Sequence, residues 1–371
     1  MRPFVLILVL AATSVAHADL PDSVGSATFR GENAALTLGF GAQIRTTSVE
    51  GDSALTLHRA RPAFLARFLD DRLRFRLHLD VAPRALELLD LFVEGEPSSS
   101  LRVRFGIAKI PFTLHWDQGY LAIPFVDWAP TTRWITGRQL GLTVFGDTGH
   151  WRWAAGLHHG ATLRPANGQR LPRVYGEAPL HRLDLRDPAP LGRLRPEVVA
   201  RVSHHAGPAA VALSGALDLA PHRIRDERLR VALDGHLHWP ALDVWAVGAL
   251  ALTENGDGDA ILGYGTALLE AELRPHPRFG VALRHSVVVR SNALRRDARR
   301  WAMEQIATTD RSRERYASVG HTRAEHEATV AVNAYVIGSD LKLQADASWL
   351  RTRGDAPTDG WRVRVQANLG F

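Results

Sequence analysis

The sequence predicts an all-β protein, a transmembrane antiparallel β-barrel of about 16 strands. Three observations lead to this fold class. Hydrophobic and polar residues alternate with a period of two along much of the chain, short and long connections alternate with strand number, and no segment after residue 18 is apolar over the ~20 residues that a transmembrane helix needs. We also expect one long loop, the third on its rim, to fold into the barrel.

The first residues have the features of a secretory signal peptide. Residues 1–3 form a short positively charged start, residues 4–16 are uncharged and mostly apolar, and Ala16-His17-Ala18 places small residues at both positions that signal peptidases recognise. The apolar run is too short for a membrane anchor. We therefore expect a signal peptide at residues 1–18 and a single barrel domain at residues 19–371.

The composition excludes several classes of protein. The chain has 371 residues, of which 46% are hydrophobic, so it is not a disordered protein. It has no cysteine, which excludes disulfides, thiolate metal sites and a cysteine nucleophile. Two of the 45 basic residues are lysines, Lys109 and Lys342, so 43 are arginines, and with 39 acidic residues the net charge is +6. This excess is too small to indicate a nucleic-acid-binding protein.

The alternation is clearest at the C-terminus. Hydrophobic residues occupy nearly every second position from Trp361 to Phe371, with Arg362 and Arg364 among the residues between them. Residues 72–81 and 101–108 repeat the pattern over about the length that a tilted strand needs to cross a bilayer. The pattern predicts sixteen strands, near residues 34–45, 54–68, 72–81, 85–94, 101–109, 138–146, 150–159, 194–204, 209–219, 227–238, 241–253, 262–273, 278–290, 322–336, 340–351 and 361–371.

The lengths of the connections distinguish a membrane barrel from a soluble β-sandwich, which can show the same alternation. Connections after even-numbered strands include the short segments 69–71 and 147–149, whereas those after odd-numbered strands include the long segments 110–137, 160–193 and 291–321. Short turns on one rim and long loops on the other are typical of outer-membrane barrels. The terminal Phe371 resembles the signal that such barrels present to the barrel assembly machinery. We therefore expect the outer membrane of a Gram-negative bacterium, with its lipid, as the location.

The segment from Leu101 to Trp116, LRVRFGIAKIPFTLHW, resembles a feature of the phosphate-selective porin O and P family. In that family a strand ends in a Gly-x-x-Lys-x-Pro-Phe motif and enters a long third loop that folds inward. The matching residues are Gly106, Lys109, Pro111 and Phe112. Residues 57–64 and 138–146 resemble neighbouring strands of the family. The resemblance implies a sixteen-stranded porin, commonly a homotrimer, that passes small anionic, phosphate-like solutes.

The inner faces of the expected strands are rich in arginine. If the hydrophobic face of each strand contacts lipid, the other face lines a water-filled lumen, where arginines favour anions. We expect eight basic residues to form the positive wall of a constriction. They are Arg72, Arg74, Arg76, Arg102, Arg104, Lys109, Arg133 and Arg138. The alternative is that the arginines pair with lumen carboxylates and only make the barrel rigid.

The long loop from Pro111 to Gly137 contains six aromatic residues, which include Phe112 and Trp116. So aromatic a loop is not expected to remain in bulk water, and we expect it to pack against the inner wall and narrow the channel. Its acidic residues Asp117 and Asp127 would then face the arginines. The alternative is an external lid or a contact between subunits.

No sequence motif indicates an enzyme. The chain has no Gly-x-Ser-x-Gly, His-Glu-x-x-His or Gly-x-x-x-x-Gly-Lys motif, and we assign no catalytic residue and no cofactor. His236 and His238 share one face of a strand, but no third ligand is in view. We therefore assign no metal site and expect these imidazoles to line the lumen.

These observations together predict a porin-like channel for the passive diffusion of small hydrophilic, anionic solutes. Two other classes of protein remain open. One is a structural or adhesive barrel whose long loops bind a partner, and the other is an outer-membrane barrel hydrolase. A steady ion current would exclude a closed structural barrel, and hydrolysis of lipid or peptide would indicate the enzyme.

Overall fold

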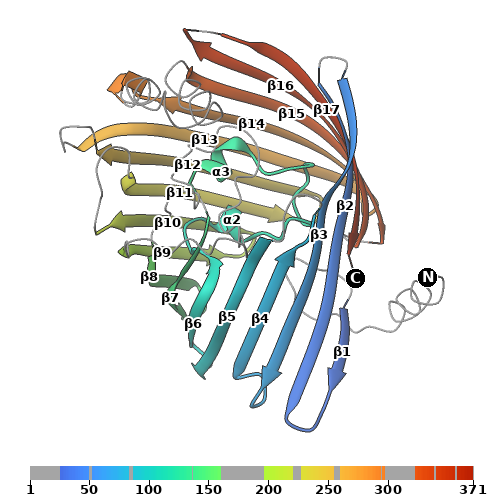
Figure 1. Ribbon diagram of the computed structural model, residues 1–371, viewed down its shortest axis with the longest axis vertical. Helices are drawn as coiled ribbons and strands as arrows, with labels where there is room; N and C mark the ends of the chain where they lie inside the picture. The colour runs from blue at the N-terminus through green and yellow to red at the C-terminus, as the bar shows by residue number, and fades with distance from the viewer. Residues whose placement is uncertain are drawn as a thin grey trace, which may run out of the picture.

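The computed structural model is a barrel of β-strands (Figure 1). It describes residues 26–49, 52–82, 87–135, 137–159, 196–219, 227–254, 260–293, 295–296, 322–337, 340–355 and 357–370. The expected signal peptide and the terminal Phe371 lie outside the described residues. No helix in the described part of the chain is long and apolar enough to cross a membrane.

The sixteen predicted strands correspond one to one with β2–β17. The strands are β1 (Ser26–Arg30), β2 (Ala34–Val49), β3 (Asp52–Phe68), β4 (Leu73–Asp80), β5 (Glu87–Ser98), β6 (Leu101–Lys109), β7 (Arg138–Asp147), β8 (Trp151–His159), β9 (Pro196–Ala206), β10 (Ala209–Asp218), β11 (Glu227–Trp239), β12 (Leu242–Glu254), β13 (Ala260–His276), β14 (Phe279–Arg290), β15 (Thr322–Ile337), β16 (Leu341–Gly354) and β17 (Asp359–Gly370). The short helices α2 (Leu114–Asp117) and α3 (Pro130–Ile135) lie between β6 and β7.

Strands β2–β17 form a closed antiparallel ring. Each strand pairs with its neighbours in sequence, and β17 pairs with β2, with Gln366 opposite Arg45. The prediction of a barrel with about 16 strands is confirmed. Strand β1 is additional and pairs with residues 35–39 on the same edge of β2 that pairs with β17 further along. Its five residues are too few to display the alternation from which the other strands were predicted.

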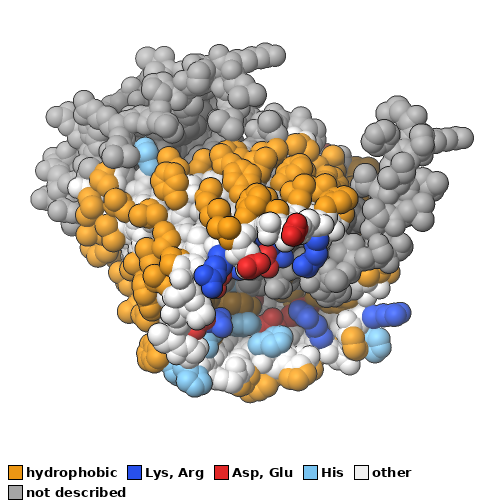
Figure 2. Space-filling view, turned by 90° about the horizontal axis from the view of Figure 1, so that it is seen from below, with side chains coloured by type: hydrophobic (Ala, Val, Ile, Leu, Met, Phe, Trp, Pro, Cys, Tyr) orange, Lys and Arg blue, Asp and Glu red, His pale blue; other side chains and the backbone are white. Residues whose placement is uncertain are grey.

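Polar side chains face the inside of the barrel and hydrophobic side chains face outward, which is the reverse of their distribution in a soluble protein. On β4, Arg76 and His78 are buried on the inner face, whereas Phe75 on the alternate face is exposed. On β17, Arg364 is buried and Val365 is exposed. Figure 2 shows hydrophobic side chains over the outside of the barrel and charged side chains around the central hollow. Such a distribution is expected when the outer face contacts lipid and the inner face contacts water.

The two rims of the barrel have connections of different length. On the short-turn rim, two to four residues join successive strands, at residues 69–72, 99–100, 148–150, 207–208, 240–241, 277–278 and 338–340. The long-loop rim has the connections 110–137, 160–195 and 291–321, so the predicted sorting of connection lengths is confirmed. An exception is the connection between β2 and β3 on the long-loop rim, which has only two residues.

Candidate pore and its constriction

The connection between β6 and β7, residues 110–137, folds into the barrel (Figure 1), and we call it the inward loop. Its ends are joined by a hydrogen bond of 3.1 Å from the Ile110 N–H to the Gly137 carbonyl oxygen. Thr113 caps helix α2 because its hydroxyl oxygen accepts a hydrogen bond from the Trp116 N–H at 3.2 Å. Most side chains of the loop between residues 110 and 132 are buried. The prediction that this loop folds inward is confirmed.

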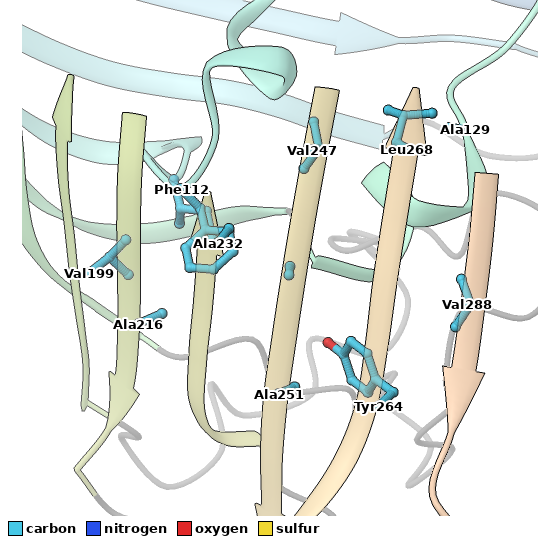
Figure 3. Close-up of a cluster of buried hydrophobic side chains, with 12 residues drawn as sticks. Phe112, Ala129, Val199, Ala216, Ala232, Val247, Ala251, Tyr264, Leu268 and Val288 are labelled. Carbon is cyan, nitrogen blue, oxygen red and sulfur yellow. The ribbon is translucent and has the colours of Figure 1, made fainter. Parts of the chain in front are cut away.

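Phe112 holds the start of the inward loop against an apolar part of the wall. Its side chain is fully buried and belongs to one hydrophobic cluster with Val199, Ala216 and Ala232, from β9, β10 and β11 (Figure 3). The small alanine side chains leave room for the aromatic ring. The Arg230 guanidinium lies 5.0 Å from the centre of the same ring, which is within the range of a cation–π interaction.

Buried polar side chains of β15 and β16 hold the backbone of the inward loop. Lys342 donates hydrogen bonds from Nζ to the carbonyl oxygens of Leu121 and Ile123, at 2.6 and 2.9 Å. Asn333 donates from Nδ2 to the carbonyl oxygen of Pro124 at 2.9 Å. These donors replace water at three carbonyl oxygens that the loop carries into the barrel.

Asp127 of the inward loop lies between arginines from three strands. Its carboxylate oxygens are 3.5 Å from Arg45 Nη1 on β2, 3.3 Å from Arg59 Nη2 on β3 and 4.0 Å from Arg364 Nη1 on β17. Its carbonyl oxygen accepts a hydrogen bond from Arg284 Nη1 on β14 at 2.8 Å. All these side chains are buried, so the charge of each group depends on its partners for compensation.

Helix α2 is attached to β11 and β13. The Leu114 N–H donates a hydrogen bond to Asp234 Oδ2 at 2.7 Å. His115 is buried, with Nε2 2.9 Å from Glu270 Oε1 and Nδ1 3.0 Å from Thr132 Oγ1. These contacts, with those of Asp127 and the loop carbonyls, attach the inward loop to β2, β3, β11 and β13–β17.

A row of arginines lines the inner face of β4, β6 and β7. Three of them surround Glu94 on β5, whose carboxylate oxygens lie 3.5 Å from Arg74 Nη1, 3.4 Å from Arg102 Nη1 and 2.7 Å from Arg104 Nη2. The side chains of these arginines remain 34%, 42% and 21% exposed, respectively. They are therefore accessible to water and to solutes inside the barrel.

Asp90, four residues earlier on β5, is the centre of a second group. Its carboxylate oxygens lie 2.9 Å from Arg138 Nε, 3.6 Å from Arg76 Nε and 3.2 Å from His78 Nδ1. Glu96 on the same strand binds Arg74 at 3.2 Å. We call the five arginines of both groups the arginine wall. They are Arg74, Arg76, Arg102, Arg104 and Arg138. The five positive charges lie beside the three carboxylates of Asp90, Glu94 and Glu96, so the group has an excess of two positive charges.

The structure brings these five of the eight expected constriction residues together and places two others, Arg72 and Lys109, elsewhere. Arg72 lies in the exposed turn between β3 and β4. Lys109 ends β6 and donates from Nζ to the carbonyl oxygens of Trp116 and Gln118, at 3.0 and 2.8 Å, so it holds the start of the inward loop. The side chain of Arg133 lies outside the described part of the chain.

The acidic residues of the inward loop bind arginines outside the arginine wall. Asp117 is exposed and lies 2.6 Å from Arg201 Nη2 on β9, whereas the arginines around Asp127 lie on β2, β3 and β17. Trp116 is buried and donates its ring N–H to the carbonyl oxygen of Gly137 at 3.2 Å, which ties it to the far end of the loop.

Several residues that hold the inward loop were not predicted, among them Arg45, Arg59 and Lys342. Arg45 directly follows the hydrophobic Ile44, so the period-two pattern makes the two side chains point to opposite faces of the strand. The sequence therefore contained a signal that Arg45 points inward. The position of Arg364 beside it depends on the pairing of β17 with β2, which leaves no local pattern in the sequence.

No protein-family model and no curated protein sequence matches the chain. Solved structures do match it. The outer membrane channel DcaP of Acinetobacter baumannii aligns with a TM-score of 0.62 and 10% identity, over 92% of this chain and 99% of that one. The chain has the fold of outer-membrane porins.

Two further porin-fold structures align over nearly their whole length. The anion-selective porin from Comamonas acidovorans aligns with a TM-score of 0.57 and 10% identity, over 91% of this chain and 100% of that one. OmpF of Salmonella typhi aligns with a TM-score of 0.58 and 11% identity, over 93% of this chain and 100% of that one. At this level of identity the similarity concerns the porin fold and not individual residues.

Proposed function

We propose that the protein is a porin channel through which small hydrophilic anions diffuse passively. The observation that supports this function most directly is the arginine wall, in which five arginines share three carboxylates on the inner face of β4–β7. The excess positive charge attracts anions and repels cations. The preferred solutes are phosphate-like, because a guanidinium group can bind two oxygens of one phosphate through parallel N–H···O bonds.

The partial exposure of the wall favours transit over tight binding. Arg74 and Arg102 contact both Glu94 and solvent, so a passing anion competes with a carboxylate that is already in place. Such competition keeps the residence of the anion short, which a conducting channel requires. At 0.15 M salt the Debye length is about 8 Å, so the charge of the wall acts only on solutes that pass close to it.

The proposed location is the outer membrane of a Gram-negative bacterium. It is supported by the porin fold and by exposed hydrophobic side chains on the outer face, such as Leu233 and Leu283, which suit contact with lipid. Export through the signal peptide, insertion by the barrel assembly machinery at Phe371 and assembly into a homotrimer belong to the same proposal. The function requires no catalytic residue and no cofactor.

The test is the conductance of the purified, folded protein in a planar lipid bilayer. A salt gradient of KCl across the membrane gives the reversal potential, and its sign shows whether chloride or potassium passes more easily. We expect a steady current with anion preference, which weakens as the salt concentration rises because the wall is screened. In a gradient of potassium phosphate, the reversal potential should again show a preference for the anion over potassium.

The alternatives give different results in the same preparation. A closed structural or adhesive barrel would give no steady current, and an outer-membrane hydrolase would cleave lipid or peptide in detergent. A cation preference would contradict the proposed role of the arginine wall, although the protein would still be a channel.

A further inference from the structure

Two histidines and one aspartate converge at the short-turn rim, in the hairpin of β11 and β12. His236 and His238 lie two residues apart on β11, so both point to the same face, and Asp243 lies directly opposite His238 in the register of the two strands. His236 Nε2 is 2.5 Å from Asp243 Oδ1, and His238 Nδ1 is 3.8 Å from Asp243 Oδ2. The neighbouring strand thus supplies the third ligand that the sequence alone did not show.

The spacing of the three groups suits one metal ion. One donor atom from each of His236, His238 and Asp243 lies within 4.8 Å of the other two. In a tetrahedral zinc site with metal–ligand bonds of about 2.0–2.2 Å, two ligand atoms lie about 3.3–3.6 Å apart, so the three groups must close up slightly around the ion. His238 is 59% exposed at its side chain, so its ring can turn by the small amount that closes the site.

The surroundings fix the orientation of His236, and the guanidinium nearest to Asp243 on the next strand is bound to another carboxylate. The His236 ring stacks on Trp245 with 3.7 Å between ring centres and an interplanar angle of 8°, which fixes its orientation. On the next strand, Arg274 directs Nε and an Nη atom to Glu272, at 2.8 and 2.7 Å.

We infer that His236, His238 and Asp243 bind one divalent transition-metal ion of the zinc type at the short-turn mouth of the barrel. Two imidazoles and one carboxylate are ligands that zinc, copper, nickel and iron prefer, whereas calcium and magnesium prefer sites made of oxygen atoms alone. The three side chains leave at least one coordination position for water or for a passing anion. This site is independent of whether the barrel conducts.

Isothermal titration of the untagged, folded protein in detergent with ZnCl2 at pH 7.5 tests the site. We expect one saturable zinc ion per chain and no comparable binding of magnesium. The variants His238→Ala and Asp243→Asn each remove a direct ligand. Each should therefore weaken zinc binding more than the loss of an outer-sphere partner, which lowers metal affinity by about 10–100-fold. His276→Ala is the matched control, since His276 is exposed at the next turn of the same rim and should not affect binding.

The variants are compared by circular dichroism before titration, so that a folding defect is recognised. The inference is overturned if the wild-type protein shows no saturable zinc binding. It is also overturned if folded His238→Ala and Asp243→Asn bind zinc as tightly as the wild type, or if magnesium binds as tightly as zinc. Because titration measures binding and not current, a failure here would leave the proposed channel function unaffected.

Discussion

The Nη2 atom of Arg59 lies 3.3 Å from Oδ1 of Asp127, and this contact joins strand β3 directly to the inward loop. Arg45 on β2 binds the other oxygen of the same carboxylate at 3.5 Å. The loop is therefore held at its middle, far from the β6 and β7 ends where the chain enters and leaves it. A loop held in this way narrows the lumen at a fixed position.

Replacing Asp127 by Asn should loosen the inward loop and destabilise the barrel. The substitution removes the negative charge that compensates Arg45, Arg59 and Arg364, and breaking a buried ion pair from one side costs about 3–5 kcal/mol. We expect a lower midpoint in urea unfolding and more frequent fluctuations of the single-channel current.

Asp117→Asn is the control, because it makes the same chemical change in the same loop. Its carboxylate is 44% exposed and its ion pair with Arg201 is partly hydrated, so the cost should not exceed about 1 kcal/mol. Equal unfolding midpoints for Asp127→Asn and Asp117→Asn would show that the buried arginines do not depend on Asp127.

Replacing Arg102 and Arg104 together by Ala should abolish the anion preference. The double variant leaves three arginines of the wall beside three carboxylates, so the excess positive charge disappears. The reversal potential in a KCl gradient should shift towards that of a non-selective pore. The control is the double variant Arg72→Ala with Arg278→Ala, which removes two charges from exposed turns and should leave the reversal potential nearly unchanged. Equal shifts of the reversal potential in both double variants would contradict the proposed role of the arginine wall in selectivity.

Gly106 should not tolerate even an alanine. Its φ of +134° is one that side-chain-bearing residues rarely adopt, and a Cβ atom there would lie 2.2 Å from the carbonyl oxygen of Leu91. We expect Gly106→Ala to lower the free energy of unfolding by about 1–3 kcal/mol or more and to fold in low yield. In the same hairpin, a Cβ atom on Gly95 would meet no other atom within 4 Å, so Gly95→Ala should fold like the wild type. Comparable folded yields for both variants would refute this reasoning.

An arginine in place of Leu233 tests contact with lipid. Leu233 lies at the middle of β11 and is 58% exposed, a position where arginine would be harmless in a soluble protein. In a bilayer the substitution should lower the free energy of unfolding by about 2–4 kcal/mol, as measured by unfolding from lipid vesicles. Leu273→Arg, near the short-turn end of β13, should cost only about 0–1 kcal/mol. A Leu233→Arg variant as stable as Leu273→Arg would indicate that this face does not contact the bilayer interior.

The period-two pattern was sufficient to predict most of the fold because it is a local property of each strand. The direction of Arg74, Arg76, Arg102 and Arg104 follows from the same pattern, since a residue between two lipid-facing residues must face inward. Strand β1 was missed because it is too short to show a pattern.

The partners of the predicted residues could not be predicted in the same way. Asp127 meets Arg59 because the inward loop crosses the lumen, and Asp243 meets His236 because two strands take one particular register. Both contacts depend on distances between segments rather than on spacing within one segment. The sequence therefore indicated which side chains point inward but not which of them touch.

The pairing of β17 with β2 sets a condition on how the protein is made. At this seam Arg45 donates from Nε to Gln366 Oε1 at 2.8 Å, and Gln43 donates from Nε2 to Asn368 Oδ1 at 2.7 Å, although the partners are 321 and 325 residues apart in sequence. Until β17 has been synthesised and delivered, both β2 and β16 expose an unpaired edge that can associate with other chains. The ring can therefore close only when the last strand is present, and a chain that ended before β17 would keep both of these edges open to association with other chains.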